Sequence, residues 1–272
     1  MEIGEKINNI TAYNESMMKS MEDKLWFVKH LDSESEYTFV DFGCADGTLI
    51  NILSQMFPKC TYIGYDVSEQ MIDLAKTKFN WNPSLNIQFF TNWNNVEERL
   101  KRSYGASVLI LSSVIHEIFS YGTDESINEF FRILSNIKFR YVFIRDMMAS
   151  RDMIRDSELA NHVRSICYAD RTLSRQLSQF EKEFSTIDNN LYLVHFLLKY
   201  RWTINWNREV KENYFPIYIE DFLNKIKDKY NINYLERFRV PFLDKCIWET
   251  FGITLTDNTH IKLFLERKHN GF

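Results

Sequence analysis

Glycine, proline and cysteine are scarce in this chain, and each scarcity excludes some classes of protein. Its 272 residues include only 8 glycines and 4 prolines, and no low-complexity segment or internal repeat is visible. The 4 cysteines are scattered without the paired spacing of metal ligands, so reduced thiols are expected. With 45% hydrophobic and 26% charged residues, the composition is that of an ordinary globular protein.

Long apolar runs and an excess of positive charge are also lacking. No run approaches the ~18 consecutive apolar residues of a transmembrane helix. The N-terminal stretch MEIGEKINNITAYNESMMKS is neither a signal peptide nor an Arg-rich transit peptide. A formal net charge of −4 gives no global basic footprint for nucleic acid. These absences predict a cytoplasmic protein without a membrane partner.

Short apolar runs alternate with helical patterns through the first half of the chain. Strands alternating with helices indicate parallel βαβ units with helices on both faces of a sheet. An amphipathic helix over about 13–31 precedes the first strand. The expected strands cover 37–42, 60–66, 86–90, 106–112 and 140–145.

The pattern changes after the fifth strand. Residues 147–229 carry helix faces but no convincing strand, and strand signals return at 231–240 and 260–268. We therefore predict an α/β fold: a doubly wound, Rossmann-like, mostly parallel seven-stranded sheet with an N-terminal helix and a helical insertion before the last two strands. The predicted division is an N-terminal helical segment (1–32), a core (33–146 and 230–272) and a helical insertion (147–229).

Two of the few glycines lie in one turn, directly after the first strand. The sequence there reads Asp41-x-Gly43-x-Ala45-x-Gly47, and Asp66 ends the next strand. A strand, a glycine-rich turn and a helix present backbone N–H groups to a polar ligand. A dinucleotide site would need a third small residue where this chain has Thr48.

This pattern resembles the class I S-adenosylmethionine-dependent methyltransferases of the small-molecule type. The resemblance implies S-adenosylmethionine as cofactor, with Asp41 and the glycine turn at its methionine end and Asp66 on the ribose hydroxyls. Val67 and Met71 would flank the adenine, whose amino group Asn92 would bind in place of the family's usual acid. The predicted cofactor contacts are Asp41, Gly43, Cys44, Ala45, Asp46, Gly47, Asp66, Val67, Met71, Asn92, Trp93 and Ser112.

His116 and Glu117 follow the fourth strand, where ligands meet doubly wound sheets. The stretch is similar to that of small-molecule O-methyltransferases in which a histidine before a helix is the catalytic base. His116 is therefore the candidate catalytic base, and Glu117 is the second candidate catalytic residue. The imidazole of His116 is expected to have an ordinary pKa of about 6.5, and the reaction is expected to need no metal. A binding or packing role for His116 is the alternative. Arg145 and Asp146, which end the fifth strand, are candidates to line the acceptor site.

The acceptor is expected to be a small molecule methylated on oxygen or nitrogen. Enzymes of this family that methylate exocyclic base amines usually carry an Asn/Asp-Pro-Pro-aromatic motif, and cytosine C5 enzymes need a Pro-Cys loop. This chain has neither. The segment 199–215 interleaves cations with aromatics, which leaves an RNA or nucleotide methyltransferase as the alternative; buried aromatics of the insertion would explain the same pattern. A non-catalytic S-adenosylmethionine-binding protein is the other alternative. We expect the insertion to fold back over the cofactor.

Overall fold

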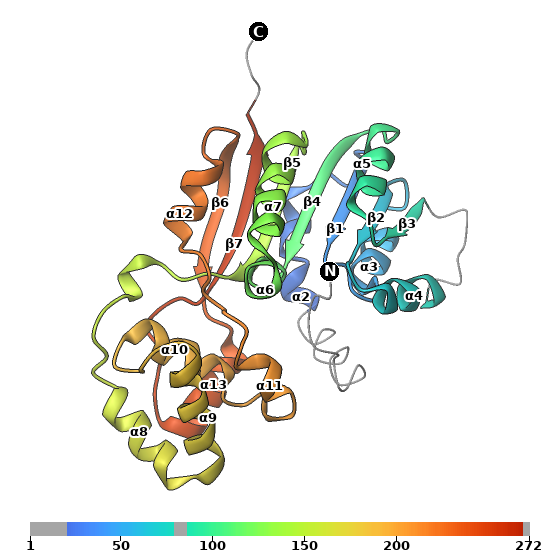
Figure 1. Ribbon diagram of the computed structural model, residues 1–272. Helices are drawn as coiled ribbons and strands as arrows, with labels where there is room; N and C mark the ends of the chain where they lie inside the picture. Colours follow the sequence, from blue (N-terminus) through green and yellow to red (C-terminus); the bar gives the residue numbers. More distant parts are fainter. Residues whose placement is uncertain (1–20, 79–85, 269–272) are drawn as a thin grey trace.

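The alternating pattern corresponds to one seven-stranded sheet (Figure 1). The computed structural model of the chain describes residues 21–78 and 86–268. The strand order is β3-β2-β1-β4-β5-β7-β6, and β7 runs antiparallel to both of its neighbours. The predicted mostly parallel, Rossmann-like fold is thus confirmed. The strands are β1 (Tyr37–Phe42), β2 (Thr61–Tyr65), β3 (Ile87–Phe90), β4 (Ala106–Ser112), β5 (Tyr141–Met147), β6 (Tyr230–Phe238) and β7 (His260–Arg267).

The central strands are apolar on both faces because helices cover both faces. In β1, Phe39 and Val40 are both buried, but they belong to different apolar clusters. Leu109 and Ile110 of β4 divide in the same way. Successive side chains of a strand point to opposite faces, so a continuous apolar run supplies two cores at once.

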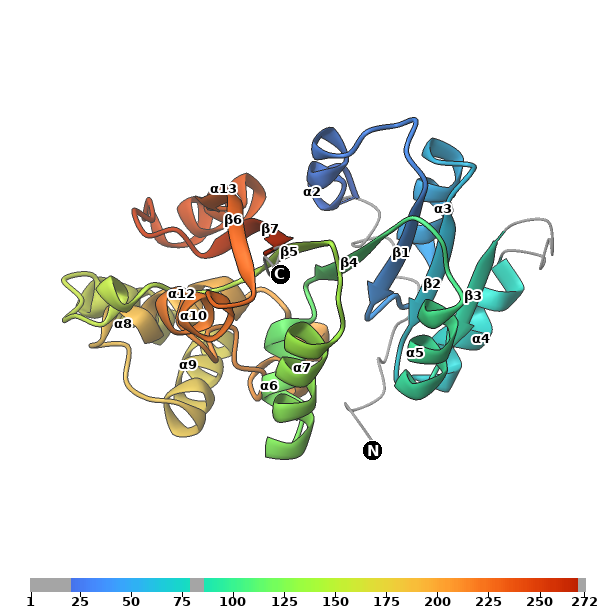
Figure 2. The same cartoon turned by 90° about the horizontal axis from the view of Figure 1, so that it is seen from above.

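Helices α5, α6, α7 and α12 pack on one face of the sheet, and α2, a 3-10 helix, α3 and α4 pack on the other (Figure 2). The helices of the first face are α5 (Trp93–Lys101), α6 (Ile115–Tyr121), α7 (Asp124–Asn136) and α12 (Ile219–Ile226). Those of the second face are α2 (Met21–Lys24), the 3-10 helix (Trp26–His30), α3 (Thr48–Met56) and α4 (Glu69–Lys78).

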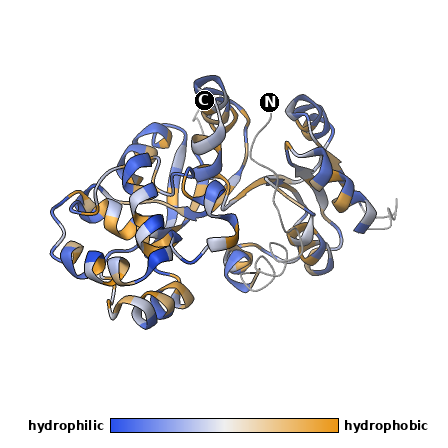
Figure 3. Cartoon of the chain, turned by 60° about the horizontal axis from the view of Figure 1, so that its bottom comes forward, coloured by the Kyte–Doolittle hydropathy of each residue, from blue (hydrophilic) through white to orange (hydrophobic). Residues whose placement is uncertain are grey.

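A second group of helices forms a lobe with its own apolar core beside the sheet (Figure 1). Its helices show hydrophobic and hydrophilic stretches side by side, as expected where one side is buried (Figure 3). None of the helices in the described residues is long and apolar enough to cross a membrane. The lobe contains α8 (Ala160–Ala169), α9 (Arg171–Glu183), α10 (Asn190–Lys199), α11 (Trp206–Glu209) and α13 (Pro241–Phe251), with short 3-10 turns at Arg151–Met153 and Thr203–Asn205.

Helix α13, which lies between β6 and β7, was not predicted from the sequence. Ile247 and Phe251 place it in the core of the lobe, so the chain returns to the lobe before the last strand. Its signals are nevertheless present. Pro241 occupies the first turn and Gly252 follows the last residue with φ +64°, which are the preferred start and stop residues of a helix.

The N-terminal helix is shorter in its described part than the predicted 13–31. Residues 13–20 lie outside the described residues, and α2 is followed by the 3-10 helix rather than by further α-helical turns. Ion pairs fix α2 to the sheet. The carboxylate of Asp23 lies 2.6 Å from Nε of Arg145 at the end of β5 and 2.5 Å from Nζ of Lys262 in β7.

The order of the sheet reverses between β1 and β4. In doubly wound sheets, ligands bind outside the carboxyl ends of the strands at this switch point. The turn that starts at Gly43 follows β1, and the segment that leads to His116 follows β4. The fold therefore brings the two informative stretches of the sequence to one edge of the sheet.

We predict that Gly43→Ala destabilises the protein more than Gly252→Ala does. Both glycines have positive φ, so either substitution is expected to cost about 1–2 kcal/mol of backbone strain. A Cβ at Gly43 would also lie 2.7 Å from Cγ2 of Val114, whereas nothing lies within 4 Å of one at Gly252. Urea unfolding of both variants measures the difference, and equal losses of stability would contradict the close contact.

Candidate active site

The turn after β1 is held in a conformation that favours glycine. Gly43 and Gly47 have φ of +78° and +73°, and Ala45 also has positive φ. The N–H groups of Gly43 and Cys44 both donate to the carbonyl of Tyr65 in β2. Val114 fills the space where a side chain on Gly43 would lie. The first glycine is thus required by the neighbouring segment after β4 as well as by the turn.

Asp66, at the end of β2, braces this turn from the side. One carboxylate oxygen accepts from the N–H of Ala45 at 3.0 Å, and the other accepts from the N–H of Ser68 at 2.9 Å. Burial raises the pKa of Asp66, and the two hydrogen bonds oppose that effect. Each oxygen retains a further lone pair for a hydroxyl donor. Of the two predicted adenine neighbours, Met71 is buried and Val67 is exposed.

Three other predicted cofactor residues make local structural contacts. The carboxylate of Asp46 accepts from Thr48 at the start of α3 and pairs with Nζ of Lys78 at 2.8 Å. The side chain of Asn92 accepts from the N–H of Asn94 and so caps α5. The buried ring of Trp93 donates from Nε1 to Glu97.

Asp41 and Ser112 end β1 and β4 at the switch point. Burial raises the pKa of Asp41 to about 7, although the positive charge of Lys24 on α2 acts in the opposite direction. Lys24 is itself buried, so α2 brings a cation to this edge. The hydroxyl oxygen of Ser112 is buried and has no hydrogen-bond partner among the described residues. Burial also raises the pKa of the Cys44 thiol, which therefore stays protonated.

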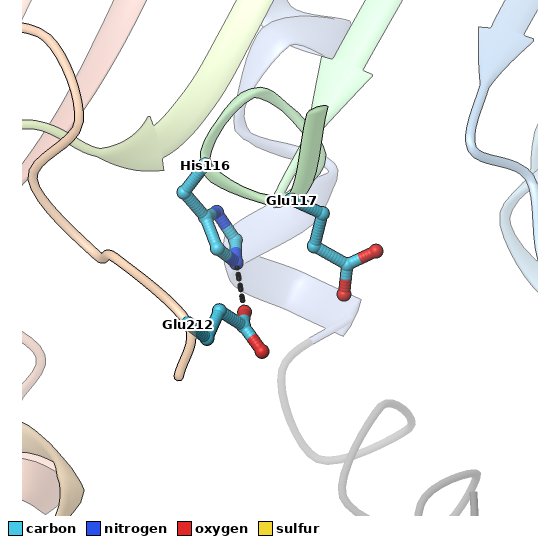
Figure 4. A group of neighbouring side chains, drawn as sticks. All are labelled: His116, Glu117 and Glu212. Atoms are coloured by element: carbon cyan, nitrogen blue, oxygen red, sulfur yellow. Dashed lines mark ion pairs between the residues drawn. The ribbon is translucent and has the colours of Figure 1, made fainter. Parts of the chain in front are cut away.

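His116 is buried in the first turn of α6 with both ring nitrogens engaged (Figure 4). Nδ1 lies 2.5 Å from Oδ1 of Asp146, at the end of β5. Nε2 lies 2.9 Å from Oε1 of Glu212, which comes from the segment between α11 and α12. Asp146 also accepts from the N–H groups of Val114 and Ile115, so one carboxylate holds both the start of α6 and the imidazole.

The two carboxylates correct the expectation of an ordinary histidine. Burial alone would lower the pKa of His116, but the charge of Asp146 and the hydrogen bonds to Asp146 and Glu212 outweigh it. They hold the pKa well above its usual range, so the sequence-based value of about 6.5 is wrong. In this arrangement the ring is an imidazolium that donates from both nitrogens.

Glu117 and Glu212 complete the cluster together with Arg208 of α11. The guanidinium of Arg208 lies 2.8 Å from Oε1 of Glu117 and 3.6 Å from Oε2 of Glu212, which also accepts from the hydroxyl of Tyr121 at 3.0 Å. Ligand-type atoms of His116, Glu117 and Glu212 lie within 4.8 Å of one another, close enough to hold a metal ion. In this arrangement Arg208 and His116 already neutralise the two carboxylates.

Comparisons with known proteins identify the type of domain that holds this site. Residues 40–137 match a family model described as a methyltransferase domain. Among solved structures, magnesium protoporphyrin IX methyltransferase (ChlM) from Synechocystis PCC 6803 with bound SAH is similar over 97% of this chain and 90% of its own, with TM-score 0.50 and 14% identity. The plantazolicin methyltransferase BamL is similar over 95% of this chain and 88% of its own, with TM-score 0.44 and 13% identity. The pyocyanin biosynthetic protein PhzM is similar over 96% of this chain and 60% of its own, with TM-score 0.49 and 12% identity. No curated protein sequence matches the chain.

Residues 40–137 carry a methyltransferase domain, and the fold is that of class I S-adenosylmethionine-dependent methyltransferases. Its cofactor is S-adenosylmethionine, and the edge of the sheet at the switch point fits that molecule. The methyltransferase has a hydroxyl at Ser112 with no partner among the described residues, and further lone pairs on the Asp66 carboxylate. Polar groups of this kind are normally paired when buried, so the Ser112 hydroxyl indicates a ligand contact.

Sequence reasoning missed Glu212 and Arg208 of the methyltransferase. Both lie in the segment 199–215, whose alternating cations and aromatics were open to a nucleic-acid interpretation. The structure turns the segment inward: Trp206, Tyr214 and Phe215 are buried, and Nζ of Lys199 donates to backbone carbonyls. The sequence REVKE at 208–212 alternates charges, but nothing in it points to His116.

We predict that Asp66→Ala weakens S-adenosylmethionine binding by about 2 kcal/mol or more, because a charged hydrogen-bond acceptor is lost and Ala45 loses its brace. Asp32→Ala is the matched control, since that carboxylate also accepts from a backbone N–H, that of Glu34, but lies in the turn before β1. Titration calorimetry on both folded variants measures the affinities. Equal affinity for Asp66→Ala and the wild type would refute the ribose contact.

Proposed function

We propose that the methyltransferase transfers a methyl group to an oxygen or nitrogen atom of a small-molecule acceptor, with His116 as the base. The observation that supports this most strongly is the position of His116. It is the buried histidine beside the carboxyl end of β4, next to the glycine turn, and its Nδ1 is fixed by Asp146. The ring is thereby oriented with Nε2 toward the segment that comes from the helical lobe.

The chemistry needs alignment and, for a hydroxyl acceptor, removal of one proton. When the cofactor is bound, the acceptor atom forms a bond to the methyl carbon while the carbon–sulfur bond breaks with its electron pair on sulfur. Nε2 of His116 would take the acceptor's proton. Asp146 would hold the ring in place and stabilise the resulting imidazolium, because its carboxylate is buried and charged.

The inward orientation of Lys199 and Arg208, two of the cations in 199–215, supports a small acceptor over a nucleic acid. Lys199 is fully buried against backbone carbonyls, and Arg208 is paired with Glu117. Neither can neutralise a phosphate backbone without breaking these contacts. We further propose that the helical lobe forms a lid over the acceptor, since Arg208 of α11 and the adjoining Glu212 bring the lobe into contact with α6, whereas α12 of the predicted insertion packs on the sheet.

We predict that His116→Gln binds S-adenosylmethionine normally and loses turnover by at least roughly a hundredfold, as expected when a general base is removed. His162→Gln is the control, because its ring binds only the carbonyl of Phe251 in the lobe. Single-turnover assays over a panel of small hydroxyl and amine acceptors measure the loss. Near-normal turnover with a raised KM would make His116 a wall of the acceptor site.

The pH dependence of the wild type follows from the raised pKa of His116. A base acts only when deprotonated, so the rate should still be rising between pH 7 and pH 9, above the ordinary histidine range of about 6.5. Stopped assays across this range at saturating cofactor measure the profile. A plateau that is already complete at pH 7 would contradict the charge arrangement around the ring.

A further inference from the structure

We propose that Glu212 is a positioning residue that occupies Nε2 of His116 until an acceptor takes the place of its carboxylate. The proposal rests on the proposed function in treating His116 as the base. It assigns to the helical lobe a direct role in the reaction centre, because Glu212 belongs to the segment that joins α11 to α12.

The geometry leaves an acceptor no other approach to the ring. His116 is 4% exposed and Glu212 is 3% exposed, so their contact is closed to solvent. Nδ1 is committed to Asp146, and Nε2 faces Oε1 of Glu212 at 2.9 Å. An acceptor hydroxyl that donates its proton to Nε2 must therefore occupy the position that Oε1 now fills.

Glu212 can leave Nε2 without becoming an unpaired buried charge. Its second oxygen, Oε2, accepts from the hydroxyl of Tyr121 at 3.0 Å and lies 3.6 Å from the guanidinium of Arg208. A rotation of the carboxylate toward Arg208 would exchange one cation for another. Stranding a buried charge is the main cost of breaking such a pair, and these partners reduce it.

The exchange would couple acceptor binding to activation of the base. While Glu212 is in place, its negative charge favours the imidazolium, which cannot accept a proton. When Glu212 withdraws, one carboxylate instead of two faces the ring, and the Nε2 proton becomes easier to lose. The charged and titratable groups around His116 are Asp146 of β5, Glu117 and Tyr121 of α6, Arg208 of α11, Glu212 and Tyr214 of the following segment, Lys199 of α10, and His260 of β7.

The test is an NMR titration of the His116 ring in protein labelled on histidine, which needs neither acceptor nor turnover. Glu212→Gln removes the charge but keeps the shape, so the ring should titrate at least about one pH unit lower than in the wild type. Glu220→Gln is the matched control, since Glu220 lies in the following helix, α12, and accepts from the hydroxyl of Ser150. Its titration should match the wild type.

Unchanged titration of His116 in Glu212→Gln would overturn the proposal. If Glu212→Gln does not fold, Tyr121→Phe provides a second measurement. It removes the hydroxyl that donates to Oε2 of Glu212, so Glu212 should become more mobile and His116 should titrate at a lower pH than in the wild type. The acid limb of the turnover profile should move with the NMR value. The two proposals can fail separately. If the titration point of His116 is lower in Glu212→Gln but the His116→Gln variant retains turnover, the contact with Glu212 stands and the role of His116 as base is rejected.

Discussion

The buried carboxylate of Asp146 is the group on which the candidate site depends. It is fully buried at the end of β5 and accepts from Nδ1 of His116 and from the N–H groups of Val114, Ile115 and Met147. Burial alone would raise the pKa of Asp146, but the charge of His116 and these hydrogen bonds lower that pKa by more, so the carboxylate stays ionised. Its negative charge also interacts favourably with the positive end of the α6 dipole.

The remaining charges follow from this one, because a buried charge requires partners. His116 neutralises Asp146, Glu212 pairs with the far side of His116, and Arg208 pairs with Glu212 and Glu117. The chain of ion pairs thus extends from the central sheet to the helical lobe. Its net stabilising effect need be only small, since desolvation of each ion opposes the attraction between them. Its structural effect is to fix the register between lobe and sheet.

The sequence was sufficient for the sheet and the cofactor edge but not for the pairing of charges. Continuous apolar runs and the turn at Gly43 are formed by residues adjacent in the sequence. The order of the βαβ units and the switch point of the sheet could therefore be predicted. The contact between His116 and Glu212 spans 96 positions, and no local pattern specifies it. For the same reason the ion pair between Asp46 and Lys78, thirty-two positions away, was not predicted.

The ion pairs that stabilise this fold oppose the proposed chemistry. A histidine whose folded pKa is raised stabilises the protein fully below the unfolded pKa of about 6.5, and this stabilisation is lost as pH rises through the folded value. The proposed base, however, is active only above that folded value. The resting site therefore holds His116 in the form that favours folding. Binding energy from the acceptor would have to shift the ring to the form that favours reaction.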